Sequence, residues 1–183
     1  NGLSDKYHPC QVLSDSMTIR EHFGNFTNLQ ISFIGDGNNV CNSLIIGSIL
    51  LGISITVATP ENYKPHSEVL DWVKQSKNAN LFEWTSNPID AVKEAHVIYT
   101  DTFVSMGQES EKEQRMKAFE SFQINTELLN SCEEDYVIMH CLPAHRGIEI
   151  TDSVIESPQS IIFPQAENRM HLQKALMVQI LNQ

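Results

Sequence analysis

Apolar residues along this chain recur with two different spacings. Runs rich in β-branched residues, which are typical of buried strands, occur at residues 29–35, 53–59, 80–84, 96–101, 136–141 and 160–164. Segments with the spacing of a helix separate them, which indicates repeated βαβ units. Because parallel crossovers are right-handed and short, we expect an α/β fold: a doubly wound, mostly parallel open sheet of the Rossmann-like kind, with helices on both faces.

The segments between the strand candidates carry ordinary helix signals. The expected helices span residues 8–24, 40–52, 89–95 and 166–181, with a short one beginning at Thr126. Asn38 or Asn39 caps the second of these helices, and Gly52 ends it. The charged segment 108–122 also has a helical period, and its charges predict a solvated face.

Length and charge limit the function. With 183 residues and 41% hydrophobic content, the chain can bury one sizeable core. Twelve basic and 23 acidic residues give a net charge of -11, which opposes a general affinity for nucleic acid or anionic membranes. No apolar run approaches the ~20 residues that span a bilayer, and no signal-peptide pattern is present, so we expect a soluble protein.

Cysteine usage favours a reducing compartment. The four cysteines form no C-x-x-C pair and no metal-ligand spacing with the histidines, so no metal site is expected. Cys41 and Cys132 are best interpreted as small buried hydrophobes.

Three unusual loops follow strand candidates. They read "GDGNNV" at 35–40, "DTFVSMGQE" at 101–109 and "HCLPAHRG" at 140–147. In open parallel sheets, ligands bind beyond the carboxyl ends of the strands, where strand order reverses. With the common strand order 3-2-1-4-5, all three loops would line one crevice.

The first loop permits two interpretations. Gly35 and Gly37 begin a dinucleotide-binding G-x-G-x-x-G pattern, but Val40 occupies the third position and the second strand candidate lacks its terminal acidic residue. Two adjacent asparagines suit a polar zwitterion instead, because side-chain amides both donate and accept hydrogen bonds. Simple helix capping by Asn38 and Asn39 explains them about equally well.

The other two loops carry candidate acid–base groups. Asp101 at a strand end can pair with an ammonium group, with Ser105 and Met106 in the following turn, or it can cap the next segment. Cys141 at a strand tip, near His145 and Arg146, can have its ionisation eased, although burial is the usual role of a lone cysteine.

Taken together, the motifs resemble a known family. "HPCQ" at 8–11, the three loops and "FPQAENR" at 163–169 occur in the order and approximate spacing of ornithine carbamoyltransferase. The "SMG" and "HCLP" pair is similar to the ornithine branch rather than the aspartate branch.

This resemblance implies two α/β domains, one for carbamoyl phosphate and one for ornithine, assembled as a homotrimer. The chain resembles the second domain and the end of the first, whose Ser-Thr-Arg-Thr phosphate motif appears nowhere in it. Residues 1–24 would then be a helical segment from the carbamoyl-phosphate domain, 25–165 the ornithine-binding domain, and 166–183 a helix that packs back toward the first domain.

The resemblance also implies site residues. His8, Gln11 and Arg169 would contact carbamoyl phosphate, together with Cys141 and the Leu142 carbonyl.

Asn39, Asp101, Ser105 and the Met106 backbone would hold ornithine. Asp101 and Cys141 would be the catalytic groups, with Cys141 helping to accept the proton of the side-chain amine.

The implied reaction joins the δ-amine of ornithine to the carbamoyl carbon and releases phosphate, giving citrulline, with no metal or organic cofactor. Such proteins belong to arginine metabolism in the cytoplasm, or in the mitochondrial matrix of eukaryotes. Because this chain offers few phosphate donors, we expect it to be weakly active or inactive alone. A paralogue that uses another amine, or a non-catalytic ligand-binding or interaction domain, remains the alternative.

Overall fold

A single parallel sheet organises the chain. The computed structural model describes residues 1–105, 107–133 and 135–182. Five strands pair in the order β3-β2-β1-β4-β5, every pair being parallel. Their bounds are β1 Gln30–Ile34, β2 Ser54–Ala58, β3 Phe82–Thr85, β4 Val97–Thr100 and β5 Val137–His140. The α/β class, these five strands and their order confirm the prediction.

Helices and short 3-10 turns connect the strands. The α-helices are α1 Pro9–Phe23, α2 Asn39–Leu51, α3 Ser67–Gln75, α4 Pro88–Val92, α5 Lys112–Ala118, α6 Thr126–Leu129, α7 Asp152–Ile155 and α8 Ile162–Leu181. The 3-10 turns are η1 Glu61–Tyr63, η2 Ala79–Leu81, η3 Glu109–Glu111 and η4 Glu120–Phe122. α3, which buries Val69 and Val73 one turn apart, is not among the predicted helices.

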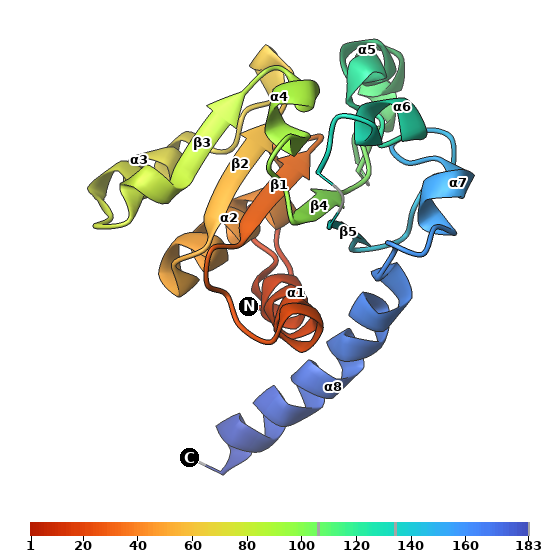
Figure 1. Ribbon diagram of the computed structural model, residues 1–183. Coiled ribbons are helices and arrows are strands. Elements are labelled where there is room, and N and C mark those ends of the chain that lie inside the picture. The colour runs from red at the N-terminus through yellow and green to blue at the C-terminus, as the bar shows by residue number, and fades with distance from the viewer. Residues whose placement is uncertain (106, 134, 183) are drawn as a thin grey trace.

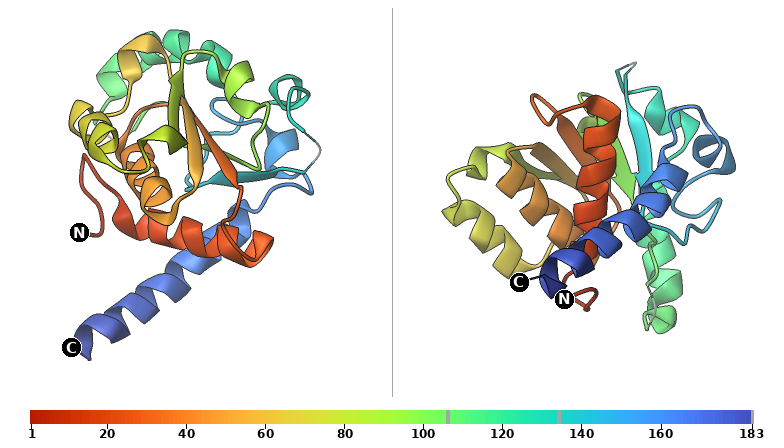
Figure 2. Two further views of the ribbon diagram at one scale, coloured as in Figure 1. Left: turned by 60° about the vertical axis from the view of Figure 1, so that its left-hand side comes forward. Right: turned by 90° about the horizontal axis from the view of Figure 1, so that it is seen from below.

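Helices cover both faces of the sheet (Figures 1 and 2), and each face has its own hydrophobic core. Phe33 and Tyr99 point to the face covered by α1, α2 and α3. Ile34 and Ile98 point to the face covered by α4, α6 and α7. Because successive side chains of a strand alternate between faces, strands buried on both sides need the continuous apolar runs seen in the sequence.

The sixth predicted strand, at residues 160–164, is wrong. Ser160 forms only an isolated bridge to Ile138 of β5, and the chain enters α8 at Ile162. Pro164 fits there because the first turn of a helix has no partner for its N–H groups. A short apolar run does not distinguish a strand from a buried helix start.

The long helix α8 begins against the body and ends beyond it. Its first half lies beside α1, where the Asn168 side-chain amide donates to the Thr18 hydroxyl at 3.0 Å. Its second half projects past the sheet (Figure 1) and exposes Met177, Ile180 and Leu181. No helix among the described residues has the length and hydropathy to cross a membrane.

Candidate functional site

The three predicted loops line one cleft at the carboxyl ends of the strands. Its volume is about 1140 Å³, which is large enough for two small polar ligands. Among the residues that line it are His8, Gln11, Asn38, Asn39, Asp101, Ser105, Cys141 and Leu142. The order of the strands therefore brings together segments that lie far apart in the sequence, as predicted.

The loop after β1 is shaped by a close backbone approach. A Cβ atom on Gly37 would lie 2.3 Å from the backbone of Lys64, so only glycine fits. The next residue, Asn38, is the cap of α2, and its side-chain oxygen accepts from the N–H groups of Val40 and Cys41 at 3.0 Å each. Its amide nitrogen points the other way and donates to Asp101 at 2.7 Å.

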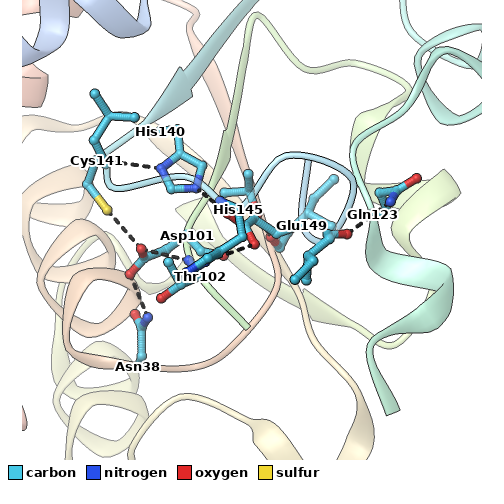
Figure 3. Close-up of polar contacts among 12 residues, drawn as sticks. Asn38, Asp101, Thr102, Gln123, His140, Cys141, His145 and Glu149 are labelled. Atoms are coloured by element: carbon cyan, nitrogen blue, oxygen red, sulfur yellow. Dashed lines mark hydrogen bonds and ion pairs between the residues drawn. The ribbon is translucent and has the colours of Figure 1, made fainter. Parts of the chain in front are cut away.

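Asp101 is the centre of the polar contacts in the cleft (Figure 3). One carboxylate oxygen accepts from Asn38, and the other accepts from the Thr102 N–H at 2.7 Å and from the Cys141 thiol at 3.0 Å. The residue is only 7% exposed. A buried carboxylate that receives several donors is well suited to hold an ammonium group.

The Cys141 thiol does not have the eased ionisation that its neighbours in the sequence suggest. Burial, followed by the negative charge of Asp101, raises the pKa of this thiol well above its ordinary value. The side chain of His145 is exposed, and its Nδ1 lies 3.7 Å from Oε2 of Glu149. In the structure, Cys141 is therefore a neutral donor to Asp101.

The remaining residues predicted to hold ornithine are placed as follows. Asn39 lines the cleft, but its amide nitrogen donates to the Ser4 carbonyl at 2.8 Å, and Asn38 is the asparagine that reaches Asp101. Ser105 also lines the cleft, with its N–H bonded to the Gln108 side chain at 3.0 Å. Met106 lies outside the described residues.

The tip of β5 is held by a buried histidine (Figure 3). Nδ1 of His140 accepts from the Leu142 N–H at 2.9 Å, so Nε2 carries the proton and donates to Glu149 at 3.2 Å. Both His140 and Glu149 are fully buried. Asp101, His140 and Cys141 place ligand-type atoms within 4.8 Å of one another, but both His140 ring nitrogens are already bonded.

His8 and Gln11 line the opposite side of the cleft, and Arg169 lies against both of them. Arg169 of α8 donates to the Gln11 side-chain oxygen and lies 3.3 Å from Nε2 of His8. Burial and the nearby guanidinium lower the pKa of His8. His8 Nδ1 and Arg169 Nε are buried and have no hydrogen-bond partner within the described part of the chain. The structure thus brings these three predicted residues together.

One buried ion pair near the cleft was not predicted. Arg115 of α5 is 3% exposed, pairs with Asp36, and donates to the Phe103 carbonyl at 2.6 Å. Its guanidinium also lies over the Tyr63 ring at 4.7 Å. The predicted solvated face of segment 108–122 is therefore wrong at this residue, because its charge is paired inside the protein.

Burial of this pair changes the pKa of its acid. Burial raises the pKa of Asp36 to about 6, although the charge of Arg115 acts in the opposite direction. Arg115 thereby links the loop after β1, through Asp36, to the loop after β4, through Phe103.

The N-terminus of α2, which follows β1, does not suit the binding of a dinucleotide. In dinucleotide-binding folds the pyrophosphate occupies the N-terminus of this helix. Here the side chain of Asn38 already takes the N–H groups of Val40 and Cys41. The position of the third glycine is filled by buried Val40.

Comparisons with known proteins identify the family and the fold. The family model for the aspartate/ornithine carbamoyltransferase Asp/Orn binding domain matches residues 27–180. The chain is 52% identical over 183 residues to ornithine carbamoyltransferase of Thermococcus kodakarensis and 51% identical over 181 residues to that of Archaeoglobus fulgidus. Each match covers 99% of this chain and 58% of the relative. The chain thus spans less than two thirds of the length of these relatives.

Solved structures show the same likeness. Ornithine carbamoyltransferase from Pyrococcus furiosus superposes with a TM-score of 0.90 at 51% identity, over 97% of this chain and 57% of that one. The anabolic enzyme from Campylobacter jejuni gives a TM-score of 0.91 at 39% identity, over 100% and 61%.

Fold and cleft together define an α/β domain with a polar cleft at the carboxyl edge of a parallel sheet. The five-stranded order and the polar loops around Asp101 are the features of that class. With its sequence and structural matches, the chain belongs to the aspartate/ornithine carbamoyltransferase family.

Proposed function

We propose that this chain is the ornithine-binding part of an ornithine carbamoyltransferase, which forms citrulline and phosphate from ornithine and carbamoyl phosphate. The contacts of Asp101 carry the proposal. A buried carboxylate, an amide from Asn38 and a thiol from Cys141 meet at the carboxyl edge of the sheet. The names of the curated relatives support ornithine as the amine.

The geometry suggests how the amine is prepared for attack. An alkylammonium group has a reference pKa near ~10.4 and must lose a proton before it can act as a nucleophile. Asp101 attracts the ammonium and accepts its proton on the carboxylate, so that one N–H bond breaks and one O–H bond forms, while the neutral Cys141 thiol donates a hydrogen bond to the same carboxylate. Because the pKa of Cys141 is raised, Asp101 rather than a resident thiolate is the first acceptor.

The carbamoyl end would bind on the opposite side of the cleft. His8, Gln11 and Arg169 supply an imidazole, an amide and one guanidinium. A phosphate group is usually held by several cations or N–H donors. We therefore propose that the chain alone is weakly active or inactive, and that an amino-terminal carbamoyl-phosphate domain completes the site. Assembly as a homotrimer and a cytoplasmic location are proposed on the family resemblance.

An amine panel tests the substrate. The chain, mixed with the amino-terminal part of a close relative, is given labelled carbamoyl phosphate and ornithine, lysine, putrescine, N-acetylornithine or aspartate in turn. We expect labelled product with ornithine, because Asp101 and the neighbouring loop suit an amino acid with a second amine. Preferential labelling of another amine would replace ornithine in the proposal while leaving the family unchanged.

A further inference from the structure

A fully buried carboxylate lies beneath the cleft, outside the groups assigned to the substrates. Asp15 of α1 has no exposed surface. One of its oxygens accepts from the side-chain amides of Gln11 at 2.7 Å and Gln165 at 2.8 Å. The other oxygen accepts from the Tyr99 hydroxyl at 2.9 Å. Asp15 thus joins α1, β4 and α8 at one point.

The side chains of Gln11 and Gln165 connect Asp15 to the two sides of the cleft by hydrogen bonds. A side-chain amide donates at its nitrogen and accepts at its oxygen, so fixing one end fixes the direction of the other. The oxygen of Gln11 accepts from Arg169 on the carbamoyl side. The oxygen of Gln165 accepts from the backbone N–H of His140 at 2.9 Å, at the tip of an edge strand next to Cys141.

We propose that Asp15 is a positioning residue that aims Arg169 through Gln11 and holds the Cys141 end of β5 through Gln165. The inference rests on the proposed function for the identity of the substrates. It assigns Asp15 a role in the geometry of both sides of the site, although Asp15 itself does not line the cleft.

The charge of Asp15 also acts on the site. Burial raises the pKa of Asp15 to about 7, although the donors Gln11, Gln165 and Tyr99 and the charge of Arg169 act in the opposite direction. Its negative charge is in turn one of the causes that raise the pKa of Cys141. The ionisable groups that face Asp15 are Tyr99 from β4, Arg169 from α8 and Cys141 from β5.

The first test follows the His140 amide by hydrogen exchange. Asp15→Ala removes the carboxylate acceptor of both glutamine amides and leaves Gln165 with only the Tyr99 hydroxyl, at 3.0 Å, as an acceptor. Gln165 is then held less firmly, and His140 exchange should accelerate by about tenfold. Asp15→Asn keeps one oxygen acceptor and should give a smaller acceleration, about threefold. Asp15→Asn also carries the test if Asp15→Ala does not fold.

The second test follows the ionisation of Cys141. The rate of its alkylation by iodoacetamide is measured against pH, with peptide mapping to separate it from Cys10 and Cys132. Both Asp15 variants remove a negative charge near the thiol, so the midpoint of the profile should move to lower pH. The midpoint reports ionisation and does not depend on how far access to the sulfur changes.

A matched control distinguishes a positioning role of Asp15 from a general loosening of the contact between α1 and α8. Thr18→Val removes the hydrogen bond between Thr18 and Asn168, which joins α1 and α8 one turn away from Asp15. It should leave the His140 exchange rate and the Cys141 midpoint unchanged. Equal changes in Thr18→Val, or no change in the Asp15 variants, would overturn the inference. Neither readout uses citrulline formation, so failure of the proposed function is recognised separately.

Discussion

The two sides of the cleft differ in how completely their polar groups are paired. On the side proposed for ornithine, both oxygens of Asp101 have partners, and Asn38 and Cys141 point at it. On the side proposed for carbamoyl phosphate, His8 Nδ1 and Arg169 Nε are buried without a partner among the described residues, whereas the only such atom near the amine side is Oε2 of Glu149, which bonds His140 through its other oxygen. Buried polar groups normally have partners, so the second side has the features of an unfinished binding surface.

This difference shows how the family's site can be divided between domains. The amine side is built from the ends of neighbouring strands and is supported by Arg115 from α5 and by His140 from β5. The carbamoyl side is built from two helices, α1 and α8, that meet beside the sheet. The predictions below test this contrast, from the largest expected effect to the smallest.

Removing Arg115 should damage the amine side most. Arg115→Leu leaves Asp36 buried without its cation, which typically costs about 3–5 kcal/mol of unfolding free energy. Urea denaturation measures the loss. Adding Asp36→Asn should recover part of it, because the uncompensated charge is then gone. A loss below about 1 kcal/mol would show that the pair does not support this side.

Neutralising Asp101 should strongly weaken the function of the amine side without unfolding it. In the reconstituted enzyme, Asp101→Asn should lower kcat/KM for ornithine by about 100-fold, equivalent to about 2.7 kcal/mol. The matched control is Asp90→Asn, which removes an exposed carboxylate paired with Lys93. Similar activities of the two variants would contradict the role of Asp101.

Asp15 is buried beneath both sides of the cleft. Because of it, the unfolding free energy of the protein should be larger in mild acid than at mildly alkaline pH. Its pKa rises from an ordinary value of 3.8 to about 7 when the protein is folded. A raised pKa means that the folded state binds the proton more tightly, so this stability is present at low pH and is lost as pH rises through about 7. Between pH 8 and pH 5 the unfolding free energy should gain about 2 kcal/mol relative to Asp15→Asn. Parallel pH profiles of the two proteins would contradict this assignment.

Changing Arg146 should affect neither side. Arg146 is exposed and pairs with Asp152 and Glu156 at 2.7 Å each, whereas the loop itself is held by His140 and by Gln123. Arg146→Gln should therefore cost less than about 1 kcal/mol and leave the activity of the reconstituted enzyme nearly unchanged. A large loss of activity would show instead that Arg146 orients the loop.

Sequence reasoning predicted the sheet well because its signals are local. Each buried strand is a continuous apolar run, and the loops after β1, β4 and β5 follow those runs directly. The strand order then places the loops in one cleft. Residues 160–164 misled because a short apolar run before a helix looks like a strand.

The supporting residues could not be predicted in the same way. Arg115 lies in a charged segment, and its partner Asp36 is 79 residues away in the sequence. Gln165 reaches Asp15 across 150 residues. The family resemblance favours Asn39 over Asn38, although only the helix-cap geometry decides which of the two amides turns toward Asp101. Such pairings depend on tertiary packing, which no local pattern records.

The most direct test of the divided site is citrulline formation by this chain at saturating ornithine and carbamoyl phosphate, alone and then mixed with the amino-terminal part of a close relative. Association of the two parts is verified by sedimentation. The account predicts citrulline only in the mixture, and its loss with Asp101→Asn. Citrulline formed by the chain alone at the rate of the mixture, and abolished by Cys141→Ala, would contradict the view that its carbamoyl side is unfinished.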